Sequence, residues 1–301
     1  MMTQFRLRIV KDIVAERLMK VLAGVSLLSF LVMGGGLLYK SWPILQAYDL
    51  WSLLTSSEWS PMGGEFGFWS FIYSSLCVTG IAIVIAVPVA LFAALFLTER
   101  KQQWVRQLIF PTLDILAGIP SVVYGLWGTL IIVPWIADVV APHFVEYSSG
   151  YTTLAGGIVL SVMILPILVS LFVEILSTVP QDLKDASASL GATHWQTARK
   201  VTLRKASPGL ISAVVLGISK AFGETLAVLM VCGCMVGIPE TPFDSCYPLP
   251  ALIANNYGEM LSLPMYESAL MFAALVLFMV ILVFNLVARL VLNRVERKFK
   301  L

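Results

Sequence analysis

Six long apolar runs dominate this sequence, and they constrain its fold more than any other feature. They lie at about 18–39, 69–97, 108–135, 152–176, 208–232 and 268–292. Each run is long enough to cross a hydrocarbon core about 30 Å thick, which takes roughly 20 residues of α-helix. Only helices and closed barrels satisfy their backbone groups in lipid, and these runs are too long and continuous for barrel strands. We therefore expect an all-α membrane protein with six transmembrane helices.

Composition agrees with this expectation and excludes several classes of protein. Hydrophobic residues make up 58% of the chain and charged residues 13%, whereas soluble proteins carry roughly 25% charged residues. A water-soluble fold of 301 residues has too little interior to bury this much apolar surface. We therefore exclude a soluble enzyme, a nucleic-acid binder and a disordered scaffold.

Lys and Arg residues fall almost entirely on one side of the expected membrane. Of the 20 such residues, 18 lie in the N-terminal segment, in the loops after the second and fourth runs, and at the C-terminal end. Because cytoplasmic loops carry an excess of Lys and Arg, we expect both termini in the cytoplasm. The chain then begins with a cytoplasmic segment at 1–17, a first transmembrane helix at 18–39 and an external loop at 40–68. A five-helix transmembrane core follows at 69–292 and includes a cytoplasmic loop at 177–207. A cytoplasmic tail at 293–301 ends the sequence.

The cytoplasmic loop at 177–207 combines charge with helical periodicity. Leu183, Ala186 and Leu190 recur at helical spacing, which predicts a short helix with one apolar stripe. Gly191 suits the left-handed residue that commonly ends such a helix, and a second short helix is expected at 195–203. The pattern leaves two interpretations open: a knob that projects from the membrane, or a loop that lies on the lipid headgroups.

Two charged residues, Lys220 and Glu224, lie inside the fifth apolar run. A charge within a membrane span is costly and marks a candidate functional site. Counted from Pro208 at about 1.5 Å per residue, Lys220 lies about 18 Å into the run, and Glu224 is expected one turn further on the same helix face. The pair suits the polar wall of a passage for a charged solute. It also suits a buried ion pair that fixes helix packing.

No catalytic or metal-binding constellation is evident in the sequence. Cys234 and Cys246 lie in the outer loop before the last run, where their spacing permits a disulfide without requiring one. His143 and His194 are expected on opposite sides of the membrane, and the cysteines show no metal-ligand spacing. The phosphate-binding loop G-x-x-x-x-G-K-[ST] is absent. We therefore expect no enzyme activity, no metal and no cofactor in this chain.

The segment at 185–193 resembles the EAA motif of binding-protein-dependent ABC importer permeases. It reads Asp-Ala-Ser-Ala-Ser-Leu-Gly-Ala-Thr and is followed by Val-Thr-Leu at 201–203. The resemblance implies a coupling helix that docks in a groove of a separate ATPase subunit. The residues that it assigns to ATPase coupling are Asp185, Ala186, Ser187, Leu190, Gly191, Ala192 and Thr193.

Two further segments are similar to the phosphate-specific members of these permeases. They read Leu-Ala-Gly-Ile-Pro-Ser-Val-Val-Tyr-Gly at 116–125 and Gly-Ile-Ser-Lys-Ala-Phe-Gly-Glu-Thr-Leu-Ala-Val at 217–228. The long first outer loop favours the PstC-like type over its PstA-like partner, and the resemblance implies the MetI-like ABC importer permease fold over about residues 66–292. The residues that it assigns to the translocation pathway are Lys220, Glu224, Thr225, Ser121 and Tyr124. Lys220 stands where these permeases typically carry Arg.

The resemblance implies one membrane subunit of an importer for inorganic phosphate in the bacterial cytoplasmic (inner) membrane. The expected partners are a second, PstA-like permease subunit, two PstB-like ATPase subunits that bind ATP and Mg, a PstS-like extracytoplasmic phosphate-binding protein, and membrane lipid. Nucleic acid is not an expected partner.

Three alternative functions stay open at this point. One is a permease for another oxyanion, sulfate or molybdate, which the ligand of the binding protein would reveal. Another is a proton-coupled secondary transporter that uses Glu224 as its proton site and works without an ATPase. The sequence offers no inverted repeat in favour of such a transporter. A membrane-embedded enzyme would need a catalytic constellation that the sequence does not show.

Overall fold

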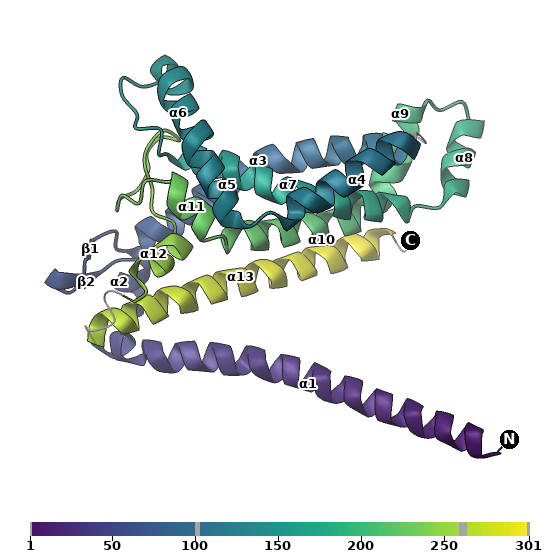
Figure 1. Ribbon diagram of the computed structural model, residues 1–301, viewed down its shortest axis with the longest axis horizontal. Helices are drawn as coiled ribbons and strands as arrows, with labels where there is room; N and C mark the ends of the chain where they lie inside the picture. The colour runs from purple at the N-terminus through teal and green to yellow at the C-terminus, as the bar shows by residue number, and fades with distance from the viewer. Residues whose placement is uncertain (1, 100–102, 259–263, 300–301) are drawn as a thin grey trace.

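The computed structural model describes residues 2–99, 103–258 and 264–299, and these residues are mostly helical. The long helices run roughly along the long axis of the molecule (Figure 1). They are α1 (Met2–Ala47), α3 (Trp69–Glu99), α7 (Thr153–Ser177), α10 (Leu203–Phe222) and α13 (Pro264–Phe299). The shorter α-helices are α2 (Leu50–Thr55), α4 (Gln103–Gly118), α5 (Ser121–Trp127), α6 (Val133–Trp135), α8 (Gln181–Ser189), α9 (His194–Thr197), α11 (Leu226–Val231) and α12 (Leu249–Asn256). The remaining elements are the antiparallel pair β1 (Trp59–Ser60) and β2 (Glu65–Phe66), and the short 3-10 or π turns η1 (Pro61–Gly63), η2 (Gly128–Ile132), η3 (Ile136–Val140), η4 (Ala141–His143) and η5 (Ala198–Thr202).

Within the described residues, six helical stretches are long and apolar enough to cross a membrane. They are Val14–Ala47, Trp69–Glu99, Ser121–His143, Thr153–Ser177, His194–Phe222 and Met265–Leu290. This confirms the six membrane helices that the sequence predicted. The first, third and fifth differ clearly from the predicted runs in their bounds.

The third apolar run is not the single helix that was expected at 108–135. Helix α4 ends at Gly118, and α5 begins after Pro120, whose backbone is extended (φ −60°, ψ 143°). Proline has no N–H to donate and disfavours the helical conformation in the residue before it, so the helix breaks there. The membrane-length helix is Ser121–His143, and α4 precedes it as a shorter apolar helix.

The fifth run, expected at 208–232, begins earlier and ends sooner in the structure. Helices α9, η5 and α10 form one continuous stretch, His194–Phe222, that passes through Pro208. Pro208 lacks the donor that would reach the Arg204 carbonyl, and the Ser207 hydroxyl donates to that carbonyl at 2.9 Å. The side chain therefore replaces the missing backbone bond, and the helix continues without a break at the proline.

The external loop is shorter than the expected 40–68, because α1 continues through Ala47. Lys40 consequently lies on α1, where its ammonium pairs with Glu267 of α13 at 3.0 Å. Rings from the loop and from the outer ends of α3 and α13 pack edge to face around Trp59, which contacts Phe66, Phe68, Phe71 and Tyr266. This cluster fixes the outer loop on the bundle.

The expected tail at 293–301 is continuous with the last helix, because α13 runs to Phe299. Residues 300–301 lie outside the described residues. So do Arg100 and Lys101, two of the basic residues on which the expected orientation depends.

The centre of the bundle is the packing of α3 against α7. Small side chains recur at every fourth position of α3 and are fully buried: Ala82, Ala86, Ala90 and Ala94. On α7, a Cβ atom added to Gly157 would lie 2.6 Å from the Cβ of Ile81. Small residues of this kind allow helix backbones to approach closely, which is a main source of packing energy between helices in lipid.

Helix α1 departs from the rest of the bundle. It contacts α13 where the rings of Phe30 and Phe278 lie 4.9 Å apart, and the two helices diverge toward the chain termini (Figure 1). Apolar side chains on α1 such as Leu27 and Leu31 remain more than half exposed. In a membrane, this surface faces lipid or another chain.

The close packing at Gly157 generates a prediction. Gly157→Ala places a methyl group against Ile81 and should destabilise the bundle by about 1–3 kcal/mol through overpacking. Gly80→Ala is the matched control on α3, because a Cβ there meets nothing within 4 Å. Thermal unfolding of the purified protein in detergent should show a lower midpoint for Gly157→Ala alone. Equal midpoints for the two variants would contradict the packing described here.

Candidate functional site

The short helix that the sequence predicted within 177–207 is present as α8, and it ends as predicted at a left-handed glycine. Gly191 has a φ of +82°, which an L side chain rarely adopts. Its N–H donates to the Ala188 carbonyl at 2.9 Å, and the Ala192 N–H donates to the Ser187 carbonyl at 3.3 Å. These two bonds close the helix in the manner of a Schellman motif.

Helix α8 projects beyond the ends of α3, α7 and α10 and lies across their direction (Figure 1). None of its residues is buried, and the apolar side chains of its stripe are exposed: Leu183 by 42% and Leu190, just past its end, by 90%. An apolar stripe without a partner in its own chain is typical of a surface that another chain covers. This geometry favours the projecting knob over a loop that lies on headgroups.

The second half of the knob is not the separate short helix that was expected at 195–203. Thr193 caps the start of the helix. The Thr193 hydroxyl accepts from the backbone N–H of Gln196 at 3.3 Å, and the backbone N–H of Thr193 donates to the Gln196 side-chain oxygen at 2.9 Å. From this capping box the helix continues without interruption into α10. The second half of the knob is therefore continuous with the fifth span.

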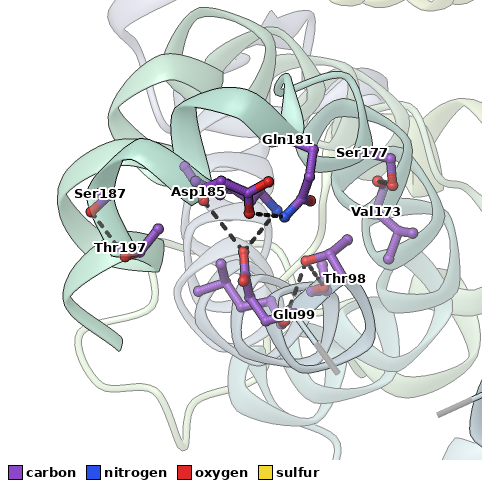
Figure 2. Close-up of polar contacts among 12 residues, drawn as sticks. Thr98, Glu99, Val173, Ser177, Gln181, Asp185, Ser187 and Thr197 are labelled. Carbon is purple, nitrogen blue, oxygen red and sulfur yellow. Dashed lines mark hydrogen bonds and ion pairs between the residues drawn. The ribbon is translucent and has the colours of Figure 1, made fainter. Parts of the chain in front are cut away.

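A polar cluster joins α8 to the bundle, and the sequence analysis missed it. The Glu99 carboxylate, at the end of α3, accepts from the Lys184 ammonium at 3.0 Å and from the Thr202 hydroxyl at 3.3 Å. Figure 2 shows Glu99 beneath α8, with the Ser187–Thr197 hydroxyl contact of 3.0 Å beside it. The residues of this cluster are far apart in sequence, so no local pattern indicated it.

The predicted pathway residues Lys220 and Glu224 do not share a helix. Helix α10 ends at Phe222, Glu224 lies in the interruption, and α11 begins only after Thr225. The expectation that the two charges lie one turn apart on one helix face is therefore wrong, because Gly223 ends the helix between them. In the part of the chain that the structure describes, Lys220 and Glu224 form no ion pair within 4.0 Å, which contradicts the alternative of a packing ion pair.

Lys220 and Glu224 also differ in their surroundings. Lys220 is exposed on the surface of the chain, whereas Glu224 is half-buried and lines a small cavity of 10 Å³. The facing wall of this cavity comes from α3, through Ser75 and Thr79. Glu224 therefore lines a mostly apolar cavity at the interruption of the fifth span, with the hydroxyl residues Ser75 and Thr79 also in the lining.

The other predicted pathway residues, Ser121 and Tyr124, lie on α5 just after the break in the third span. Ser121 is half-buried, and the Tyr124 side chain is 6% exposed. The Tyr124 hydroxyl donates to the Leu116 carbonyl at 2.7 Å. Tyr124 therefore satisfies a backbone group that the break leaves without its helical partner.

The two interrupted spans pack against each other directly after their breaks. A Cβ atom on Gly125 of α5 would lie 3.1 Å from the Cα of Ala227 of α11. The Thr129 hydroxyl also donates to the Met230 carbonyl at 3.1 Å. The structure thus brings the start of α5, with Ser121, and the start of α11, with Thr225, to about the same level of the bundle.

The thiols on the outer side of the bundle are free. Cys234 and Cys246 do not form the disulfide that their spacing permits. The Cys246 N–H instead donates to the Cys232 carbonyl at 2.9 Å. Among the described residues, no group of three or more His, Cys, Asp or Glu side chains is arranged to hold a metal ion.

Comparison with known proteins shows which family the chain resembles. The family of binding-protein-dependent transport system inner membrane components matches residues 86–301. A relative from Bacillus subtilis, described as a probable ABC transporter permease protein YqgH, is 40% identical and aligns over 80% of this chain and 77% of its own length. The phosphate transport system permease protein PstC of Xylella fastidiosa is 35% identical over 82% and 80% of the two chains. That of Mesorhizobium japonicum is 31% identical over 91% and 88%.

Solved structures show the same fold at lower sequence identity. A chain of the MetNI methionine ABC transporter aligns with a TM-score of 0.55 and 19% identity, over 76% of this chain and 94% of its own. A chain of a bacterial alginate ABC transporter aligns with a TM-score of 0.60 and 17% identity, over 92% and 94%. The MetI-like fold that was expected from the sequence is confirmed. The chain is a multi-pass membrane protein that belongs to the family of binding-protein-dependent transport system inner membrane components, the permease subunits of ABC transporters.

Proposed function

We propose that this chain forms part of the translocation pathway of an ATP-driven importer for inorganic phosphate. The observation that carries the proposal is an exposed coupling helix in a chain whose relatives, at 31% to 35% identity over most of their length, are named PstC phosphate permeases. ATP hydrolysis takes place on a separate subunit, and this chain supplies the passage and the surface on which that subunit acts.

The proposed assembly contains a second, PstA-like permease subunit, two PstB-like ATPase subunits and a PstS-like phosphate-binding protein. ATP and Mg belong to the ATPase subunits. Both termini and the α8 knob lie on the cytoplasmic side of the inner membrane. The arrangement in Figure 1 supports this orientation, because both chain ends point toward the end of the molecule that carries α8 and α9.

The continuous helix His194–Phe222 supports a mechanism for coupling. A displacement of α8 by the ATPase passes through the capping box at Thr193 into this helix. The helix ends next to the interruption that carries Glu224. Movement of the knob therefore reaches the interrupted part of the span, where the backbone is free of regular helical bonds and can change conformation.

The position of Lys220 supports a pathway along the exposed face of α10. A lysine that faced lipid inside a span would cost about 2.5–3.5 kcal/mol. Lys220 is exposed on this chain, so its charge is best accommodated in an aqueous passage between this subunit and the second permease. The Lys220 ammonium attracts a phosphate anion. Glu224, in the interruption just after α10, repels the anion and so favours its release.

Substitution of the two charges tests the pathway. Lys220→Ala and Glu224→Gln should each lower phosphate uptake about tenfold or more, an effect of about 1.4 kcal/mol. The first removes the charge that attracts the anion, and the second removes the charge that favours its release. The four-component complex should still assemble, as judged by co-purification in mild detergent. Lys40→Ala is the control, since Lys40 pairs with Glu267 on the outer side. Normal uptake by both pathway variants would remove these residues from the mechanism.

Gly191 tests the role of the knob. Gly191→Val forces a β-branched residue into a left-handed conformation and should cost about 1–2 kcal/mol, which distorts the end of α8. Gly191→Asn is the control, because Asn tolerates this conformation. Recovery of the ATPase subunit with the tagged permease, and phosphate uptake, should fall for Gly191→Val and persist for Gly191→Asn. Identical behaviour of the two variants would contradict a coupling role for the helix end.

Reconstitution of the purified complex in liposomes tests the substrate and the energy source. Labelled phosphate should enter only with ATP and the binding protein present, and excess sulfate or molybdate should not compete. Competition by either oxyanion would reassign the substrate. Uptake by this chain alone, driven by a proton gradient, would overturn the ABC mechanism.

A further inference from the structure

Glu99 occupies a place in the fold where one carboxylate meets several elements. It is the last residue of α3, the helix that packs against α7 at the centre of the bundle. Its carboxylate accepts from Lys184 of α8 and from Thr202 of η5, at 3.0 and 3.3 Å. One side chain therefore connects α3, the coupling helix and the start of the fifth span.

The ion pair of Glu99 with Lys184 differs from the other described ion pairs in its burial. The side chains of Glu99 and Lys184 are 19% and 13% exposed. Those of Glu16 and Lys20, an ion pair within α1, are 61% and 74% exposed. Water strongly screens the attraction between Glu16 and Lys20, and exposed ion pairs of this kind contribute little to stability. Partial burial strengthens the attraction between Glu99 and Lys184, and it makes the loss of one partner costly to the other.

Helix α8 has little else that fixes its position. None of its side chains is buried. Its other described side-chain contact with a neighbouring helix is the hydroxyl pair of Ser187 and Thr197, at 3.0 Å. A cavity of 510 Å³ opens between α8 and the end of α3, and Thr98, Glu99 and Lys184 are among the residues that line it. No side chain of α8 is buried, so the described side-chain link between α8 and α3 is this ion pair.

Helix α3 leads from this ion pair to the cavity that contains Glu224. Ser75 and Thr79 of α3 form the facing wall of that cavity. Thr79 and Glu99 are separated by 20 residues on one continuous helix, which corresponds to about 30 Å. Glu224 itself comes just after the end of α10 in the sequence, and α10 is continuous with η5. Two of the elements that line the cavity therefore connect to the α8 knob: α10 does so directly, and α3 does so through Glu99.

We propose that Glu99 is a positioning residue for transport, because its ion pair with Lys184 makes α3 move together with the coupling helix. This inference rests on the proposed function. The ATPase then acts on the α10 and α3 sides of the Glu224 cavity at once. Without the ion pair, a displacement of α8 reaches the α10 side directly and the α3 side only through the packing between helices, so that ATP is hydrolysed with less solute moved.

The test measures ATP hydrolysis and phosphate import in the same liposomes, with the whole reconstituted complex. Glu99→Gln keeps the size of the side chain and removes its charge. The amount of phosphate imported per ATP hydrolysed should fall roughly fivefold or more, the usual lower range for coupling between sites. Lys184→Gln should behave alike, and Lys184→Arg should keep the wild-type ratio. Glu16→Gln is the matched control, since it breaks an exposed ion pair within one helix.

A charge exchange separates positioning from a general loss of structure. Glu99→Lys combined with Lys184→Glu restores an ion pair at this place and should recover most of the import per ATP that each single variant loses. An unchanged ratio in Glu99→Gln would overturn the proposal. So would an exchange variant that is no better than the single variants.

Hydrogen exchange of the amides at 181–190 provides a readout that needs no substrate. In the intact complex, Glu99→Gln should speed this exchange, whereas Glu16→Gln should leave it unchanged. Unchanged exchange in Glu99→Gln overturns the proposal. A wild-type complex that hydrolyses ATP and imports no phosphate would count against the proposed function, and the exchange result would still decide the role of Glu99.

Discussion

The structure depends on one constraint: inside lipid, the chain must satisfy its own backbone hydrogen bonds. Two prolines show how it does so. Pro208 leaves the Arg204 carbonyl without its N–H, and the Ser207 hydroxyl donates to it. Pro120 ends a helix, and the Tyr124 hydroxyl donates across the break to Leu116. Side chains thus replace backbone bonds that the prolines remove. Of the candidate pathway residues, Ser121 and Tyr124 follow the break at Pro120, and Glu224 lies in the break of the fifth span.

The sequence predicted the number of membrane helices and the short helix α8 well, because both depend on local properties. Span count follows from the length of apolar runs, and the end of α8 follows from the φ that Gly191 alone adopts freely. Span boundaries were less accurate. The hydropathy of the third run does not reveal the extended backbone at Pro120. The charged residues at 199–205 lower the local hydropathy, so the start of the fifth helix at His194 was not predicted.

The sequence indicated the candidate pathway residues one by one, but it did not predict how they are arranged. Ser121 and Thr225 lie at the same level because α5 packs against α11 through Gly125 and Ala227, which are far apart in sequence. The helix end at Gly223 separates Lys220 from Glu224, and periodicity had placed the two on one face. Glu99 was overlooked because a single acidic residue at the end of a span carries no local signal, and its partners lie 85 and 103 positions away.

Helix α1 has a consequence for the surrounding bilayer. Its 46 residues extend about 69 Å, more than twice the thickness of a hydrocarbon core of about 30 Å. A helix of this length does not fit within the hydrocarbon core when it lies perpendicular to the membrane. It therefore tilts, or its basic N-terminal turns extend out of the core to the anionic lipid headgroups. Helix α1 contacts α13 at Phe30 and Lys40 and diverges from it toward the N-terminus (Figure 1), so its N-terminal part has room to tilt as the membrane thickness requires.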